Sequence, residues 1–216
     1  MKAIIFDLDG TLLDSARSIL DSMKRAFESC GLVLVLPLEA SLIGPPLRET
    51  LQRLSPESDA CQIGELEQSF ISSYDEKGCL EAYPFPGVDE MLRDLKLHGF
   101  ALHIVTNKRA YPTQKILKHL GWNKVFGRVY ANDTFVEERY NKSHLLGRLM
   151  MDLNLQSKDC AYIGDREEDA SAAHENDMKF LWAGWAFAES NVPYKKDGYL
   201  QPSDVVRFAI SETPLD

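Results

Sequence analysis

Two carboxylates follow directly behind a short apolar run near the start of the chain. Residues 3–6 (AIIF) are typical of a buried strand, and residues 7–11 (DLDGT) are typical of a polar turn. Because ligands in open α/β sheets bind beyond the carboxyl ends of strands, we expect Asp7 and Asp9 at the mouth of a crevice. One carboxylate could attack a substrate while the other handles its proton. A surface turn is the alternative interpretation, since Asp-Gly is a common turn dipeptide.

Three other segments carry polar residues at the ends of predicted strands or the starts of predicted helices. They are Thr106, Asn107 and Lys108 in one segment, Lys142 in the next, and Gly164, Asp165 and Asp169 in the last. Free backbone N–H groups and the positive end of a helix dipole favour an anion at such positions. If Arg166 opens a helical turn, Asp165 and Asp169 lie at one edge of it.

These residue types together suit the transfer of a phosphoryl group. A phosphate ester resists attack by a second anion, and Mg²⁺ held by carboxylate oxygens cancels part of that charge. A hydroxyl, backbone amides and a Lys ammonium can surround the remaining phosphoryl oxygens. Asp7 could then form an aspartyl-phosphate, with Asp9 protonating the leaving alcohol and later deprotonating the attacking water.

The rest of the chain supplies the elements that would bring these groups together. Apolar runs at residues 101–105, 160–163 and, more weakly, 129–131 and 180–183 predict strands, and stretches of helical periodicity lie between them. Alternating strands and helices predict an α/β fold, a doubly wound, mainly parallel Rossmann-like sheet. Gly99 and Gly121 are placed where helix C-caps are expected.

Residues 15–84 interrupt this alternation and show helical spacing without a convincing strand. We therefore expect a helical insertion after the first strand, called the helical insert below, with residues 1–14 and 85–216 forming the Rossmann-like core. The Pro-rich segment 83–87 would be a stiff connector back to that core. The insert would cover the crevice as a lid.

Composition narrows the class of partner. The chain has 216 residues and a net charge of −9, which argues against a nucleic-acid partner. Four scattered cysteines fit free thiols better than a disulfide framework. Neither a signal-peptide pattern nor an apolar run of membrane-spanning length is evident, so we expect a cytoplasmic protein without a membrane partner. Monomer and homodimer both remain open.

The four groups, taken in order, resemble the motifs of the haloacid-dehalogenase-like hydrolase superfamily, in particular its phosphoglycolate-phosphatase-like group. The resemblance covers nearly the whole chain, and the helical insert matches the small cap of that group. It implies an Mg²⁺-dependent phosphatase acting on a small phosphorylated metabolite.

The resemblance also implies a role for each motif residue. Asp7 is the nucleophile and Asp9 the acid and base, and Mg²⁺ is bound by Asp7, the backbone carbonyl of Asp9, and Asp165, with Asp169 supporting that site. The phosphate contacts would come from Gly10, Thr11, Thr106, Asn107 and Lys142. Arg48, in a segment similar to the cap loop that closes on the active site, and Lys108 are weaker candidates for substrate binding, and a solvated surface cation is an equal alternative for each.

Two positions depart from the family pattern. Ser143 follows Lys142 where the family often has Pro, and Asn176-Asp177 stand where many relatives carry Ala-Gly. Lys142 is interpreted as the lysine of the third motif despite the first departure, and the second is interpreted as a change of turn.

Three rival functions remain. A phosphomutase shares Asp9 and the metal but passes the phosphoryl group to a second hydroxyl. A non-hydrolytic signalling or binding module would keep the phosphate on Asp7. A dehalogenase is disfavoured, because a carbon–halogen bond needs neither the metal nor an acid at position 9.

The five histidines lack metal-ligand spacing, and the Trp182, Trp185 and Phe187 cluster is expected to pack in the core.

Overall fold

A computed structural model describes residues 1–135, 141–187, 198–199 and 201–212. Six strands form one sheet, in the order β5-β4-β1-β6-β7-β8, and each neighbouring pair is parallel. They are β1 (Ala3–Phe6), β4 (Ala101–Val105), β5 (Arg128–Tyr130), β6 (Cys160–Gly164), β7 (Lys179–Ala183) and β8 (Gly198–Tyr199). The prediction of a parallel α/β sheet is confirmed, including its two weaker strands.

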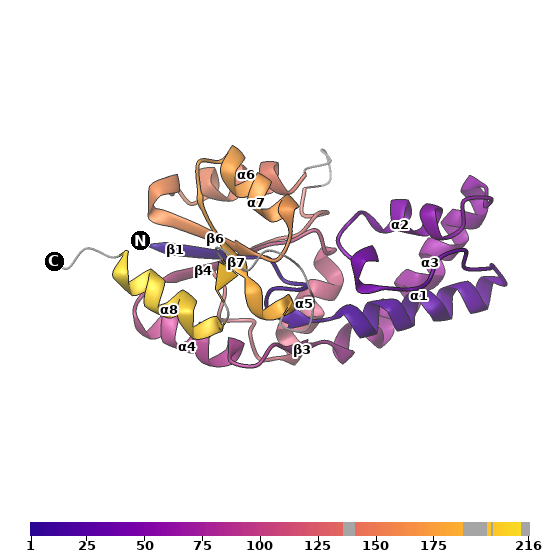
Figure 1. Cartoon of the computed structure of the whole chain (residues 1–216), viewed down its shortest axis with the longest axis horizontal. Coiled ribbons are helices and arrows are strands. Elements are labelled where there is room, and N and C mark those ends of the chain that lie inside the picture. Colours follow the sequence, from indigo (N-terminus) through magenta and orange to yellow (C-terminus); the bar gives the residue numbers. More distant parts are fainter. Residues whose placement is uncertain (136–140, 188–197, 200, 213–216) are drawn as a thin grey trace.

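Helices cover both faces of this sheet (Figure 1). On one face lie α6 (Lys142–Asp152) and α7 (Glu167–Glu175), and on the other α4 (Val88–Leu97), α5 (Ala110–His119) and α8 (Pro202–Ser211). Successive residues of β1 serve opposite faces, as the pleat requires. Ala3 and Ile5 pack in the core cluster of α6 and α7, whereas Ile4 and Phe6 join the larger cluster on the other side. The sheet is therefore buried on both faces, which explains its apolar strands.

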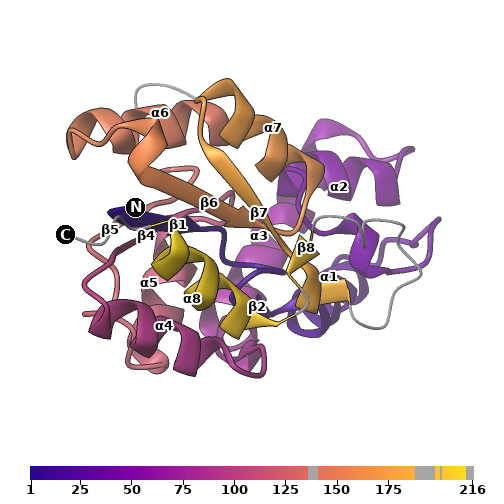
Figure 2. The ribbon, with the colours of Figure 1, turned by 60° about the vertical axis from the view of Figure 1, so that its left-hand side comes forward.

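The segment between β1 and α4 is helical, as predicted. It contains α1 (Ala16–Cys30), η1 (Ala40–Leu42), α2 (Leu47–Leu54), α3 (Ala60–Glu76) and η2 (Gly78–Glu81). Two short strands, β2 (Leu13–Asp14) and β3 (Tyr83–Pro84), pair antiparallel where the chain enters and leaves this segment. The sequence did not predict that ribbon. Figure 1 shows α1, α2 and α3 to one side of the sheet, and Figure 2 shows them behind its far end.

The parallel register places the predicted polar groups at one edge. Phe6 lies opposite Ile104 on β4 and Ile163 on β6, so the residues after each strand meet beyond the same end of the sheet. That end faces the helical insert (Figure 1). Within the described ranges, no helix is both long enough and apolar enough to cross a membrane.

Candidate active site

Three carboxylates converge beyond the ends of β1 and β6. Asp7 follows β1, Asp165 follows β6, and Asp169 lies in the first turn of α7. One oxygen of each lies within 4.8 Å of the others, and all three side chains are buried. Such a group could hold a metal ion, because carboxylate oxygens are the ligands that hard divalent cations prefer.

Asp7 has one partnered and one unpartnered oxygen. Its Oδ2 lies 3.2 Å from the Nζ of Lys142, while its Oδ1 is buried without a hydrogen-bond partner. Burial raises the pKa of Asp7, and although the charge of Lys142 opposes this, the charge of Asp169 adds to the rise. A buried carboxylate oxygen without a hydrogen-bond donor suits a cation, so the residues present fit Mg²⁺.

Asp169 is fully occupied by donors from its own surroundings. Its Oδ1 accepts from Lys142 Nζ at 2.6 Å and from the Tyr162 hydroxyl at 3.2 Å. Its Oδ2 accepts from the backbone amides of Asp165 at 3.1 Å and Arg166 at 3.0 Å. With four donors on its two oxygens, this carboxylate orients Lys142 and Asp165.

Lys142 opens α6 and reaches both carboxylates with a side chain that is only 3% exposed. Burial works to lower the pKa of Lys142, but the charges of Asp7 and Asp169 outweigh burial and raise it. The ammonium is therefore held in its charged form beside Asp7. Ser143 in place of the family's Pro does not displace it.

Asp165 accepts a hydrogen bond from Thr11, a residue expected to contact phosphate. The Thr11 hydroxyl donates to its Oδ1 at 3.0 Å, and the Trp185 ring N–H donates to the Thr11 carbonyl at 2.8 Å. Gly10 has φ +83°, and a Cβ there would lie 2.4 Å from Asp165 Oδ2, so only glycine fits. Burial, together with the charges of Asp7 and Asp169, raises the pKa of Asp165.

Gly10 and Thr11 have hydrogen-bond partners within the protein. The Gly10 amide donates to the Leu13 carbonyl at 2.9 Å, and the Thr11 amide to the Leu8 carbonyl at 3.4 Å. Together with the Thr11 hydroxyl on Asp165, these bonds shape the turn after β1. Both residues position Asp165 and the turn, and the phosphate contacts expected of them stay a prediction.

Asp9 lies in a second polar cluster, on the side of β4. Lys108 Nζ contacts both of its oxygens, at 2.9 Å to Oδ1 and 2.8 Å to Oδ2, and the Ser15 hydroxyl donates to Oδ1 at 2.6 Å. Lys108 is buried, with a 6% exposed side chain, so the alternative of a solvated surface cation is wrong. Burial opposes but does not outweigh the charge of Asp9, which raises the pKa of Lys108.

Thr106 and Asn107, which precede Lys108, also have hydrogen-bond partners within the protein. Thr106 is buried at the end of β4, where its hydroxyl accepts the Lys108 amide at 3.3 Å. The Asn107 amide donates to both oxygens of Glu168 at 3.0 Å. Asn107 is thereby joined to α7, and the phosphate contact expected of it stays a prediction. Glu168 is a near-site carboxylate that was not predicted from the sequence.

The loop before α2 reaches the core, but Arg48 does not. Gly44 has φ +121°, and a Cβ on it would lie 2.7 Å from the Arg166 guanidinium, so this loop lies against the residue that follows Asp165. Arg48 instead pairs with Glu67 of α3 at 3.0 Å and donates to the Ala60 carbonyl at 3.2 Å. The structure keeps Arg48 within the helical insert and brings Arg166 to the boundary in its place.

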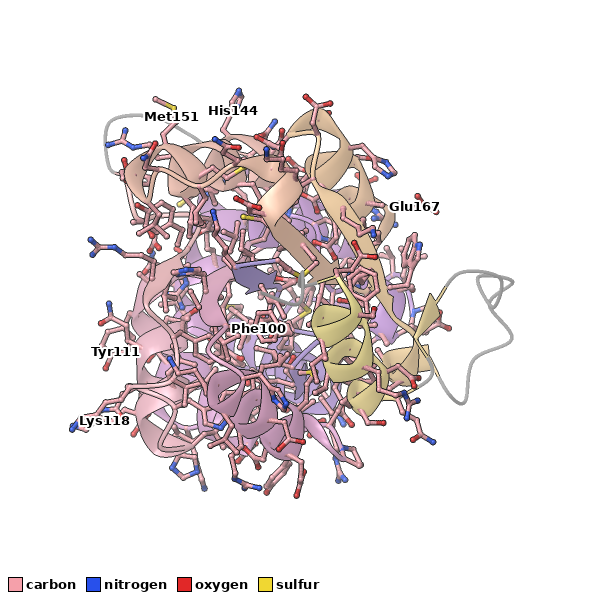
Figure 3. The ribbon with its side chains drawn as sticks, turned by 90° about the vertical axis from the view of Figure 1, so that its left-hand side faces the viewer. Phe100, Tyr111, Lys118, His144, Met151 and Glu167 are labelled. Carbon is pink, nitrogen blue, oxygen red and sulfur yellow. The ribbon has the colours of Figure 1, made fainter. Side chains whose placement is uncertain are left out.

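Among the described residues, no histidine joins the three carboxylates as a possible metal ligand. His103 is buried in β4 and accepts the Arg128 amide, and His144 projects from the outer side of α6 in Figure 3. The prediction that Trp185 is a packing residue is confirmed by its burial. Its bond to the Thr11 carbonyl could not be found from sequence, because nothing in the chain marks that pairing.

A parallel sheet with a buried carboxylate cluster at its carboxyl edge, a lysine against it and a helical insert after the first strand defines a class of α/β hydrolases. The family model described as haloacid dehalogenase-like hydrolase matches residues 4–183. The chain belongs to this family, so the predicted superfamily and the enzyme class, hydrolase, are confirmed.

Curated relatives carry two kinds of name. The chain is 32% identical over 189 residues to a phosphoglycolate phosphatase of Xanthomonas campestris, covering 86% of this chain and 84% of that protein. It is 28% identical to a phosphoglycolate phosphatase of Aquifex aeolicus, covering 96% of each. It is also 29% identical to a tyrosine-protein kinase of Mycobacterium tuberculosis, and the match spans only 64% of that protein's length.

A solved structure agrees with the fold. A haloacid dehalogenase-like family protein of Streptococcus pneumoniae superimposes with a TM-score of 0.81 at 27% identity, covering 96% of this chain and 98% of that one. This structure and the family match confirm the Rossmann-like core with its inserted helices.

Proposed function

We propose that this chain is a phosphatase that hydrolyses a small phosphomonoester through an aspartyl-phosphate on Asp7. The observation that carries the proposal is the Asp7 carboxylate itself. It is buried beyond the end of β1, held by Lys142 on one oxygen, unpartnered on the other, and accompanied by Asp165 within reach of one ion. An acidic cluster with an ammonium beside it suits an anionic substrate once a divalent cation has offset the acidic charge.

Two displacements complete the reaction. In the first, an Asp7 oxygen bonds to phosphorus as the bond to the ester oxygen breaks, and Asp9 gives its proton to the departing alcohol. In the second, Asp9 takes a proton from water, whose oxygen bonds to phosphorus while the bond to Asp7 breaks. Inorganic phosphate leaves and both aspartates return to their starting forms.

Asp7, Asp165 and the Asp9 carbonyl would hold Mg²⁺, which when bound neutralises charge on the phosphoryl oxygens. Thr11 orients Asp165, and Asp169 orients both Asp165 and Lys142. Lys142 stabilises the charge on the phosphoryl oxygens. We assign Thr106 to the same phosphate site, because it is buried at the end of β4, beside the strand that carries Asp7.

We further propose that residues 15–84 form a cap domain over a core made of residues 1–14 and 85–216. The β2–β3 ribbon at its base and the contact of the Gly44 loop with Arg166 support this division. A cap in that position excludes bulk water and selects the leaving group. Phosphoglycolate is the first substrate to test, since relatives covering most of this chain carry that name.

The test is phosphate release by the wild type and by Asp7→Asn over a panel of small phosphoesters with Mg²⁺. We expect the wild type to release inorganic phosphate and Asp7→Asn to lose turnover by several orders of magnitude, because the nucleophile is gone. Asp14→Asn is the matched control, since Asp14 is exposed on β2 and should leave turnover unchanged.

The outcome of this assay distinguishes the phosphatase from the rival functions. Substantial turnover by Asp7→Asn would refute the nucleophile assignment. Phosphoryl transfer to a second hydroxyl without free phosphate would indicate a phosphomutase. A long-lived phospho-Asp7 with negligible turnover would indicate a phosphate-accepting module.

A further inference from the structure

A tyrosine of the helical insert lies against the lysine that holds Asp9. Tyr74 is in α3, and the centre of its ring is 4.7 Å from Lys108 Nζ. The Tyr74 hydroxyl is buried and has no hydrogen-bond partner. Because a buried hydroxyl is normally paired, one without a partner beside a charged cluster indicates a group that a ligand would meet.

The end of α3 that carries Tyr74 is fixed to the core. Arg109 contacts both oxygens of Asp75, at 3.0 and 2.5 Å. Lys115 donates to the carbonyls of Asp75 and Glu76, at 2.6 and 2.8 Å. Two successive residues of the insert, 74 and 75, therefore lie against two successive residues of the core, 108 and 109. The tyrosine is held in a defined place beside Lys108.

The arrangement lies on the leaving-group side of the proposed reaction. Asp9, which would protonate the departing oxygen, has both oxygens on Lys108. Its Oδ1 also accepts from Ser15, so Oδ2 is the oxygen that becomes free if Lys108 moves to another acceptor. A neutral group cannot replace a carboxylate on a buried ammonium, but another carboxylate can.

We propose that Tyr74 is a specificity-determining residue that, with Lys108, binds a carboxylate on the leaving alcohol. This rests on the proposed phosphatase function. One carboxylate oxygen accepts from the Lys108 ammonium and the other from the Tyr74 hydroxyl. The same contact draws Lys108 away from Asp9 Oδ2, which is then free to meet the ester oxygen. A substrate without the carboxylate leaves Lys108 on Asp9 and reacts slowly.

The test compares 2-phosphoglycolate with ethyl phosphate, which has a methyl group in place of the carboxylate. In the wild type we expect kcat/KM to favour 2-phosphoglycolate by about 100-fold or more, since a site built for a polar group rejects the analogue that lacks it. Tyr74→Phe keeps the ring and should reduce this ratio by about tenfold, the size expected for one lost hydrogen bond to a charged group. Lys108→Met should bring the ratio close to one.

Tyr111→Phe is the matched control. Tyr111 is 60% exposed on α5 and projects from the surface in Figure 3, so the ratio should not change. A wild-type ratio near one, or an unchanged ratio in Tyr74→Phe of normal melting temperature, would overturn the proposal.

A binding measurement distinguishes failure of the carboxylate subsite from failure of the proposed phosphatase function. Calorimetry on Asp7→Asn with Mg²⁺ measures the affinity for both esters without turnover. We expect 2-phosphoglycolate to bind more tightly than ethyl phosphate, and the added Tyr74→Phe change to remove part of the difference. If the wild type hydrolyses neither ester but this Tyr74-dependent difference persists, the subsite stands and the hydrolytic function falls. Equal binding of both esters would overturn the subsite.

Discussion

At the scale of single residues, Asp169 shows how a carboxylate can serve the site without touching the substrate. Each of its oxygens accepts two donors, among them Lys142 and the backbone amide of Asp165. We predict that Asp169→Asn lowers the affinity for Mg²⁺ by about 10- to 100-fold, because the amide group can no longer accept from all four donors. Calorimetric titration with MgCl₂ measures this.

Asp177→Asn makes the same chemical change at an exposed position beyond the end of α7. Asp177 has φ +52°, a conformation that asparagine also tolerates, so the Mg²⁺ affinity should be that of the wild type. An Asp169→Asn protein that binds Mg²⁺ normally would show that the four contacts only stabilise the fold.

Sequence identified the chemistry-bearing residues better than their contacts. Asp7, Asp165, Asp169 and Lys142 meet as predicted, because parallel strands place their carboxyl ends at one edge. Thr11 and Asn107 have protein partners, Asp165 and Glu168, that were not predicted. Those partners come from segments far away in the chain, and the spacing of residue types carries no signal for such pairings.

At the scale of elements, polar contacts at the end of α3 help to attach the helical insert to the core. Besides the short β2–β3 ribbon, the end of α3 is held to α5 by Arg109 and Lys115. We predict that Arg109→Gln speeds amide hydrogen exchange in residues 70–76 several-fold, since a partly buried paired contact of this kind is worth on the order of 1 kcal/mol. Because Tyr74 loosens with it, KM for 2-phosphoglycolate should rise.

Arg93→Gln on α4 tests whether loss of any surface arginine has this effect. Arg93 is exposed, and neither exchange in α3 nor KM should respond to its replacement. Exchange in α3 that is as slow in Arg109→Gln as in the wild type would show that Lys115 and the apolar contacts alone hold the insert.

Two departures from the family pattern meet at a helix–helix contact. The Asn176 side-chain amide donates to the Ser143 carbonyl at 3.0 Å and to its hydroxyl at 3.2 Å, joining the end of α7 to the start of α6. The turn that follows is left-handed at Asp177, as a glycine turn would be. The departure could be read from the sequence, but the pairing of Asn176 with Ser143 depends on how α6 and α7 pack, which periodicity does not give.

At the scale of the whole molecule, the buried acidic charge of the site lowers the stability of the folded protein when no cation is bound. The chain carries a net charge of −9, and two of its carboxylates, Asp7 and Asp165, are buried close together. Burial raises the pKa of both. The charge of Lys142 opposes the rise at Asp7, the charge of Asp169 adds to it, and the charge of Asp7 adds to the rise at Asp165. The folded state therefore holds these protons to higher pH than the unfolded state does.

The sign of the resulting pH dependence follows from proton linkage. Between about pH 4 and about pH 7 the folded protein binds more protons at this pair than the unfolded chain, so the pair's contribution to stability falls as the pH rises. His103 acts in the opposite direction, because burial lowers its pKa and its protonation below neutral pH favours unfolding. Only a comparison that leaves His103 unchanged isolates the carboxylates.

The test is the difference in melting temperature between the wild type and Asp165→Asn, measured once in EDTA and once in MgCl₂. In EDTA, the advantage of Asp165→Asn should grow from pH 5 to pH 7.5, since the variant lacks one of the two repelling charges. In MgCl₂ at pH 7.5, the wild type should gain stability and the variant should gain much less, because the ion binds the charged carboxylates of the folded state. A difference that is independent of both pH and Mg²⁺ would mean that the two carboxylates are compensated within the protein and do not need a cation.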